Sequence, residues 1–221
     1  MLIKEPLKSY VLRKGRITSN QKRAINKLWN EFVLDSEIDL KDSLNKERMA
    51  LDIGFGAGET TCYLAKEKPE MFVLGAEVYM SGIGSLLSKI GEEGLENIKI
   101  LNSDIVPFLE NKVRECSLDL VLMFYPDPWP KRKHHKRRLL QKNFLELLYA
   151  KIKKGGIFYF KTDWDHYYQE ASKILLDKNK WQVIDKDSLD TFLKEIPRTS
   201  FELKAIASGR KSKEIILKRI N

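Results

Sequence analysis

Acidic residues stand at or just beyond the ends of four apolar segments in this chain. They are Asp52 in "LDIG", Glu77 in "GAEVY", Asp104 in "LNSD" and Asp127 in "YPDPW". If the segments form parallel strands, their carboxyl ends meet at one edge of a sheet, where doubly wound folds bind ligands. Ionised carboxylates there accept hydrogen bonds and attract positive charge. The spacing therefore predicts a pocket for a ligand that carries hydroxyl, amino or cationic groups.

A glycine-rich loop follows the first of these segments. Gly54, Gly56 and Gly58 form a GxGxG pattern, which permits a tight turn and close approach of a ligand to the backbone. An ordinary glycine-rich turn is about as common an explanation for such a loop. Glu59 occupies the position where a dinucleotide fingerprint needs Gly or Ala, and its charge opposes a pyrophosphate. The loop therefore favours a nucleoside cofactor without phosphates, such as S-adenosylmethionine, over NAD.

Two of the acids suit particular groups of that cofactor. Glu77 is placed to accept both ribose hydroxyls, and Asp104 is placed to accept a hydrogen bond from the adenine amino group. Taken alone, either residue is explained as well by a solvated cap, and Asp104 by a helix cap before Ile105. Together with Asp52 and the glycines, they favour a cofactor site.

The segment "YPDPWPKRKHHKRR" places an acidic turn directly before the densest positive charge in the chain. Pro126 and Pro128 restrict the backbone around Asp127, which holds its carboxylate on a stiff turn. Six Lys or Arg and two His fill positions 131–138. Such a run is often a solvated face, but beside a cleft it is typical of phosphate binding.

The elements that position these residues alternate between strand-like and helix-like patterns. Strands are expected at 49–54, 71–78, 97–104, 118–125, 155–163, 181–185 and 213–219. Helices are expected at 59–66, 80–90, 105–113 and 135–151, after an N-terminal amphipathic helix capped by Ser19 or Asn20. This order predicts an α/β fold with a mostly parallel seven-stranded sheet, helices on both faces and an antiparallel C-terminal edge. We expect a basic N-terminal extension over 1–45 and the main domain over 46–221.

Composition indicates which class of binding partner and which cellular compartment suit the protein. The 221 residues include 43% apolar residues, enough for a sizeable core, and carry a net charge of +9 that favours a polyanionic partner. Cys62 and Cys116 stand alone, so neither a disulfide nor a zinc site is expected, and a cytoplasmic location fits. No apolar run is long enough to cross a membrane. Nothing in the sequence decides between a monomer and a homodimer.

Six stretches resemble one known family, the tRNA (guanine-N7-)-methyltransferases. They are "YVLRKGRITSNQ", "LDIGFGAGE", "GAEVY", "PDPWPKRKHHKRRL", "FKTDWDHY" and "TSFE", which together span nearly the whole chain. The resemblance implies a Rossmann-like class I methyltransferase fold. It also implies methyl transfer from S-adenosylmethionine to N7 of a guanosine in the variable loop of tRNA, giving 7-methylguanosine and S-adenosylhomocysteine.

The resemblance also implies roles for particular residues. Asp127 would be catalytic and, with Asp52, Gly54, Gly56, Gly58, Glu77 and Asp104, would line the cofactor site. The guanosine would be held by Lys131, Asp163, Thr199, Ser200, Phe201 and Glu202. The tRNA would be contacted by Lys133, His134, His135, Lys136, Arg137 and Arg138. Asp52 stands where the family carries the longer Glu, which implies a contact through water.

Three other functions compete with this interpretation. The fold and the cofactor pocket do not choose the acceptor, so methylation of another RNA or of protein stays open. A nucleic-acid-binding module without catalysis would keep the basic segment but has no use for four acidic strand ends. A nicotinamide oxidoreductase is opposed by Glu59. Trp129 and Trp164 suit stacking on a base, although core packing is the more common role of tryptophan.

Overall fold

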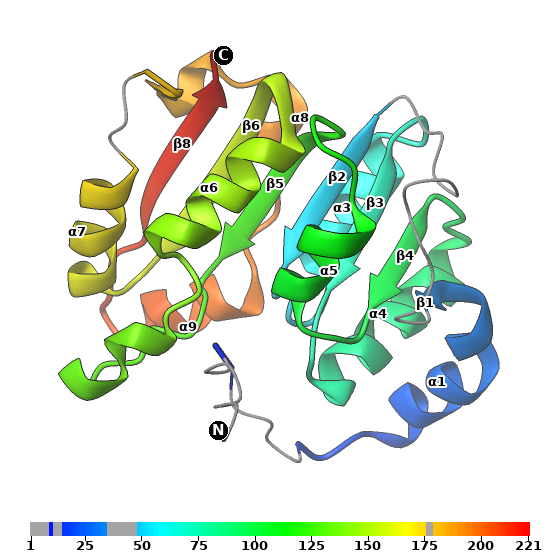
Figure 1. The fold of residues 1–221 in the computed structure, drawn as a ribbon. Coiled ribbons are helices and arrows are strands. Elements are labelled where there is room, and N and C mark those ends of the chain that lie inside the picture. The colour runs from blue at the N-terminus through cyan, green and yellow to red at the C-terminus, as the bar shows by residue number, and fades with distance from the viewer. Residues whose placement is uncertain (1–8, 11–14, 35–47, 176–178) are drawn as a thin grey trace, which may run out of the picture.

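A single eight-stranded sheet organises the molecule, in the order β1-β4-β3-β2-β5-β6-β8-β7 (Figure 1). The computed structural model describes residues 9–10, 15–34, 48–175 and 179–221. The strands are β1 (Val33–Leu34), β2 (Met49–Ile53), β3 (Phe72–Ala76), β4 (Ile98–Leu101), β5 (Leu118–Phe124), β6 (Ile152–Thr162), β7 (Trp181–Ile184) and β8 (Lys213–Arg219). The seven expected strands are present, and the two-residue β1 adds an eighth beside β4.

The pairing of the strands places a ligand site near β2. β1 to β6 pair in parallel, whereas β8 runs antiparallel to both β6 and β7. This confirms the predicted parallel sheet with an antiparallel C-terminal edge. β2 lies between β3 and β5, so the chain order reverses direction there, and such a switch point opens a crevice beyond the carboxyl ends of the strands.

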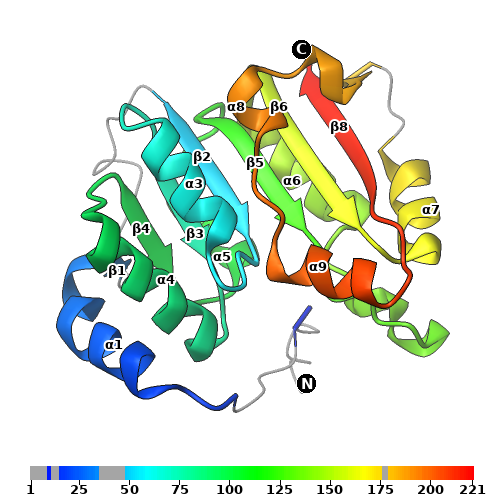
Figure 2. The same ribbon diagram turned by 180° about the vertical axis from the view of Figure 1, so that it is seen from behind.

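Helices cover both faces of the sheet (Figures 1 and 2). They are α1 (Ser19–Phe32), α3 (Glu59–Glu67), α4 (Met80–Glu93), α5 (Ile105–Lys112), α6 (Lys142–Lys151), α7 (Asp165–Ile174), α8 (Thr191–Lys194) and α9 (Ser200–Ala207), with short 3₁₀ helices η1 (Arg132–Arg137) and η2 (Lys186–Ser188). α5, α6 and α7 pack on one face, and α1, α3, α4 and α8 pack on the other. Because both faces are covered, the central strands β2 and β3 are buried at all five of their positions.

Several predicted boundaries shift by a few residues, and two differences have a clear physical reason. The cap of α1 is Thr18, not Ser19 or Asn20, because Thr18 and Gln21 form a reciprocal capping box. The helix expected over 135–151 is divided into η1 and α6. The backbone between them bonds elsewhere: the Gln141 side chain donates to the Arg138 carbonyl, and the Leu140 amide donates to the Tyr167 hydroxyl. Like charges packed at helical spacing also oppose a continuous helix.

The N-terminal helix is joined to the rest of the fold through α4. The Gln21 side chain donates to the Ser85 hydroxyl at 2.8 Å, and Phe32 is buried in the core on this face. Much of the basic stretch before α1 lies outside the described residues. The division of the chain into 1–45 and 46–221 therefore stays a prediction.

Candidate active site

A pocket of about 380 Å³ opens beyond the carboxyl ends of β2, β3, β4 and β5, at the switch point of the sheet. Its volume lies within the range of small-molecule sites. Predicted cofactor residues on its wall are Gly54, Gly56, Glu77, Asp104 and Asp127. The three acids Glu77, Asp104 and Asp127, spread over 51 positions of the sequence, thus meet around one cavity.

The glycine loop has the conformation that its composition predicts. Gly54, Gly56 and Gly58 have φ angles of 72°, 61° and 79°, in the left-handed region that strains other residues. A Cβ on Gly56 would lie 3.0 Å from the ring of Phe201, so a larger residue would also push into the pocket wall. Gly58 caps α3 and does not line the pocket. Glu59 follows it in the first turn of α3, where a phosphate would otherwise bind.

Glu77 fixes the loop and keeps part of its carboxylate for a ligand. Oε1 accepts hydrogen bonds from the amides of Val78 and Tyr79 at 2.7 and 3.0 Å, and Oε2 accepts one from Gly56 at 3.0 Å. A carboxylate has about four acceptor positions, so one remains, on Oε2. Burial raises the pKa of Glu77, the three amides lower it, and the nearby charge of Asp127 raises it further. A cationic ligand would relieve that repulsion.

Asp52 lies beneath the pocket and does not line it. Its side chain is 2% exposed, and its Oδ2 accepts a hydrogen bond from the Thr61 hydroxyl at 2.7 Å. The pKa of Asp52 is raised to about 7. Burial is the largest cause, the charges of Glu77 and Glu59 add to it, and the Thr61 hydrogen bond partly opposes it. Asp52 therefore acts on the pocket through its charge and through α3, which carries Thr61.

Asp104 is a helix cap that also lies on the pocket wall. Its Oδ1 accepts the amide of Val106 at 3.0 Å, which caps α5, and the residue also lines the pocket. The cap uses one of its acceptor positions, so the others remain for a ligand.

The turn that carries Asp127 is strained and held at both ends. Asp127 is exposed and lines the pocket. Tyr125 and Trp129, on either side of it, have φ angles of 52° and 43°, which are uncommon for non-glycine residues and persist only when their surroundings fix them. The Tyr125 amide donates to the carbonyl of Lys161 at 2.8 Å, and the Trp129 indole donates to the carbonyl of Ser9 at 2.9 Å.

The residues predicted to hold a guanosine do not all meet at the pocket. Ser200 and Phe201 line it. Thr199 caps α9 by accepting the Glu202 amide at 3.2 Å, and Lys131 is exposed outside the pocket wall. The carboxylate of Asp163 accepts a bond from the Arg210 guanidinium at 2.6 Å. The Arg210 ion pair must therefore open or be shared before Asp163 meets a base.

The basic segment forms η1 and projects most of its charge outward. Lys131, Arg132, Lys133 and Lys136 are exposed, whereas Arg137 is half-buried with its guanidinium 5.1 Å from the centre of the Trp129 ring. Desolvation, followed by the charges of neighbouring lysines and Arg137, lowers the pKa of His134. This lowering of its pKa favours the neutral form of His134.

Arg138, which was predicted to contact tRNA, differs from the exposed cations of its segment. Its side chain is 2% exposed, whereas Lys131, Arg132, Lys133 and Lys136 are exposed. It forms an ion pair with Glu170 of α7, the acid that the segment itself lacks. A guanidinium buried in this way presents no surface to a phosphate.

Several pocket residues have no signal in the sequence. Tyr10 and Gln21 reach the pocket from the N-terminal region, and Lys204 reaches it from α9. Their positions depend on how distant segments pack. Val78, Ser103 and Tyr125, which follow β3, β4 and β5, could have been found by the strand-end argument.

Known proteins resemble the chain over most of its length. A family described as "Putative methyltransferase" matches residues 46–215. A tRNA (guanine-N(7)-)-methyltransferase of Nitrosococcus oceani is 38% identical over 97% of this chain and 91% of its own length. One from Methylobacillus flagellatus is 37% identical over 99% of this chain and 93% of its own. The chain belongs to the tRNA (guanine-N7-)-methyltransferase family. The resemblance seen in its motifs is confirmed.

Solved structures confirm the fold of this methyltransferase. An rRNA methylase from Streptococcus thermophilus is similar with a TM-score of 0.54 and 14% identity, over 82% of this chain and 92% of the other. A SAM-dependent O-methyltransferase from Thermotoga maritima gives a TM-score of 0.53 and 18% identity, over 90% and 71% of the two chains. The fold is therefore the Rossmann-like class I methyltransferase fold. None of the helices in the described ranges has the length and hydrophobicity that a bilayer crossing requires.

Proposed function

We propose that the chain transfers a methyl group from S-adenosylmethionine to N7 of a guanosine in the variable loop of tRNA. The observation that carries the proposal is the pairing of an acidic pocket with a cationic surface across the Asp127 turn. The pocket suits a cationic methyl donor, and the exposed cations of η1 suit the phosphates that deliver a base. A cytoplasmic location and a tRNA partner belong to the same proposal.

The residues of the pocket fit S-adenosylmethionine. Glu77 has one acceptor position left for a ribose hydroxyl, so the second hydroxyl would need to share an oxygen that already accepts an amide. Asp104 keeps acceptor positions for an adenine amino group, and Gly56 leaves the loop without a side chain. Asp52 would act through its buried charge. When bound, this cofactor supplies an electrophilic methyl group on a sulfonium.

The reaction needs alignment more than acid–base chemistry. N7 of guanine carries a lone pair and no proton, so no base has to remove one. As the new N–C bond forms, the C–S bond breaks with its electrons going to sulfur, and positive charge appears on the purine. A carboxylate that accepts hydrogen bonds from the N1 and N2 edge of the base would stabilise that charge.

Asp127 is our candidate for that carboxylate. It lies on the pocket wall between the proposed cofactor site and the cations of η1. Asp163 is a second candidate, conditional on release from Arg210. Lys133, Lys136 and Arg137 would bind tRNA phosphates, and Lys131, Ser200 and Phe201 would lie near the entering nucleoside.

The acceptor is tested by nucleoside analysis after reaction with labelled S-adenosylmethionine. Purified tRNA should yield 7-methylguanosine, and a tRNA with adenosine in place of the variable-loop guanosine should yield none. Label in ribosomal RNA or in protein, but not in tRNA, would favour the alternative acceptors. Protein that binds tRNA without retaining the methyl donor would be a binding module.

A further inference from the structure

The strained turn at Asp127 needs a rigid anchor on its C-terminal side. Its N-terminal side is bonded to β6 through the Tyr125 amide. On the other side, the carbonyl of Pro128 accepts a hydrogen bond from Nε of Arg138 at 2.8 Å. Pro128 is adjacent to Asp127, so a shift of this carbonyl moves the carboxylate.

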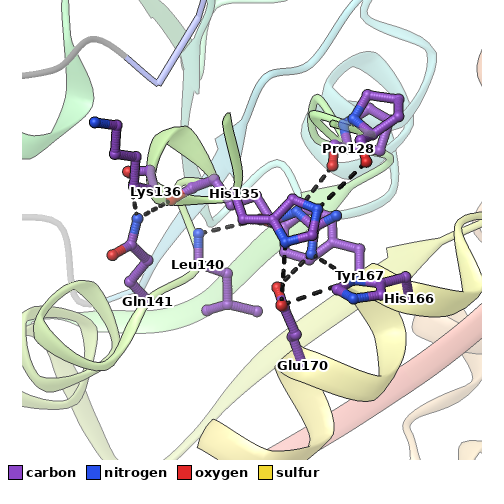
Figure 3. Close-up of polar contacts among 10 residues, drawn as sticks. Pro128, His135, Lys136, Leu140, Gln141, His166, Tyr167 and Glu170 are labelled. Atoms are coloured by element: carbon purple, nitrogen blue, oxygen red, sulfur yellow. Dashed lines mark hydrogen bonds and ion pairs between the residues drawn. The ribbon is translucent and has the colours of Figure 1, made fainter. Parts of the chain in front are cut away.

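Arg138 is itself fixed from three sides. Nη1 donates to Nδ1 of His166 at 3.0 Å and is paired with the Glu170 carboxylate, and the guanidinium lies 4.7 Å from the centre of the Tyr167 ring (Figure 3). All three partners belong to α7. The planar guanidinium offers donors in fixed directions, which a lysine ammonium does not.

α7 gives this contact a rigid base. Tyr167 is fully buried, its ring packs edge-on against Phe160 of β6 at 5.6 Å, and its hydroxyl accepts the Leu140 amide at 3.1 Å. The helix is thus tied both to the sheet and to the segment that follows Arg138. The chain of contacts runs from the sheet through α7 and Arg138 to the Asp127 turn.

We propose that Arg138 is a positioning residue that holds the Asp127 carboxylate through the backbone of Pro128. The inference rests on the proposed function, because it takes Asp127 as the group that meets the guanine. It separates Arg138 from the exposed cations of the same segment. Lys133 and Lys136 would hold RNA, whereas Arg138 would hold the turn.

The same cluster does not make a convincing metal site. His135, His166 and Glu170 bring ligand atoms within 4.8 Å of one another. However, the Arg138 cation already neutralises Glu170 and donates to Nδ1 of His166. A metal ion would meet both a positive charge and an occupied nitrogen, so these contacts favour the positioning role.

The test is Arg138→Lys, measured for methyl transfer under saturating S-adenosylmethionine. The lysine keeps the charge but cannot reproduce the fork that joins Pro128 to α7. We expect kcat to fall about 10- to 100-fold, since misplacement by about 1 Å costs this much in aligned reactions. The KM for tRNA and the salt dependence of tRNA binding should stay within about 2-fold of wild type.

Measuring Arg138→Lys in the Asp127→Asn variant as well as in the wild type distinguishes a positioning role from general damage to the fold. In Asp127→Asn the carboxylate charge is absent, so moving the turn should change little. Arg138→Lys should therefore lower single-turnover rates less than about 2-fold in that background. A purely structural defect would reduce the rate by the same factor in both backgrounds. Lys154→Arg, at an exposed position of β6, controls for the exchange of one cationic side chain for the other and should retain wild-type kcat.

Three results would overturn the inference. They are wild-type kcat for Arg138→Lys, equal losses in the two backgrounds, and a weaker salt dependence of tRNA binding with kcat unchanged. If Arg138→Lys does not fold, Glu170→Gln decides: it should lower kcat about 3- to 10-fold at unchanged KM, and wild-type kcat would refute the role. Absence of 7-methylguanosine with wild-type protein is a different outcome, which refutes the proposed function.

Discussion

Substitution of Asp52 by Asn tests the electrostatics beneath the pocket. Asp52 is 2% exposed, and its pKa is raised from 3.8 to about 7. Between these values the folded protein holds a proton that the unfolded chain releases. Stability contributed by this group is therefore present at low pH and is lost as pH rises from about 4 to about 7.

The size of this change in the free energy of unfolding follows from the pKa shift of Asp52. About three pKa units at about 1.4 kcal/mol each correspond to roughly 4 kcal/mol of destabilisation that is complete above pH 7. Asparagine is neutral throughout and can still accept the Thr61 hydrogen bond. Its amide replaces a proton-bearing oxygen, which costs about 1 kcal/mol. We therefore expect Asp52→Asn to be about 1 kcal/mol less stable than wild type at pH 4 and about 3 kcal/mol more stable at pH 8.

Urea unfolding at pH 4, 5, 6, 7 and 8 measures this difference. Asp187→Asn, at an exposed position, controls for the loss of one acidic residue. The decisive quantity is the trend with pH in the free energy of unfolding of Asp52→Asn relative to wild type. A difference that stays constant, or that favours the variant most at pH 4, would refute the account of Asp52 as a destabilised buried acid.

Other predictions concern binding and turnover. A cationic ligand favours ionised Asp52, so calorimetry should show S-adenosylmethionine binding that tightens from pH 6 to 8 with proton release, and Asp52→Asn should flatten this dependence. Asp127→Ala should lower kcat about 100-fold or more while tRNA affinity stays within about 2-fold; equal losses in filter binding and turnover would contradict its role. Replacing Lys133 and Lys136 by Met should weaken tRNA binding and reduce its salt slope by about 1 to 2. An unchanged slope would show that η1 does not hold phosphates.

Local sequence rules predicted the part of the site that depends on strand ends. Glu77 and Asp127 follow apolar strands in the sequence, and parallel pairing brings such positions to one edge. The glycines were recognisable because a left-handed loop requires their type. The resemblance to the family then predicted the methyl acceptor, a guanosine of tRNA, which neither the fold nor the pocket determines.

Positions that depend on distant partners could not be read from the sequence. Arg138 belongs to a run of cations, and only Glu170 and Tyr167, about 30 residues later, turn it inward. Asp163 is likewise paired with Arg210, 47 residues away. Asp52 is buried beneath the cavity, where it accepts a hydrogen bond from Thr61 of α3. Each of these outcomes is set by tertiary packing.

The central claim is that the lone pair on guanine N7 is the acceptor. The most direct measurement compares two tRNAs that differ only in the variable-loop guanosine, which is replaced in one by 7-deazaguanosine. That analogue keeps the N1 and N2 edge but has carbon in place of N7. We predict methyl transfer to the guanosine tRNA, none to the analogue, and equal binding of both. Equal methylation of the two tRNAs would contradict the account.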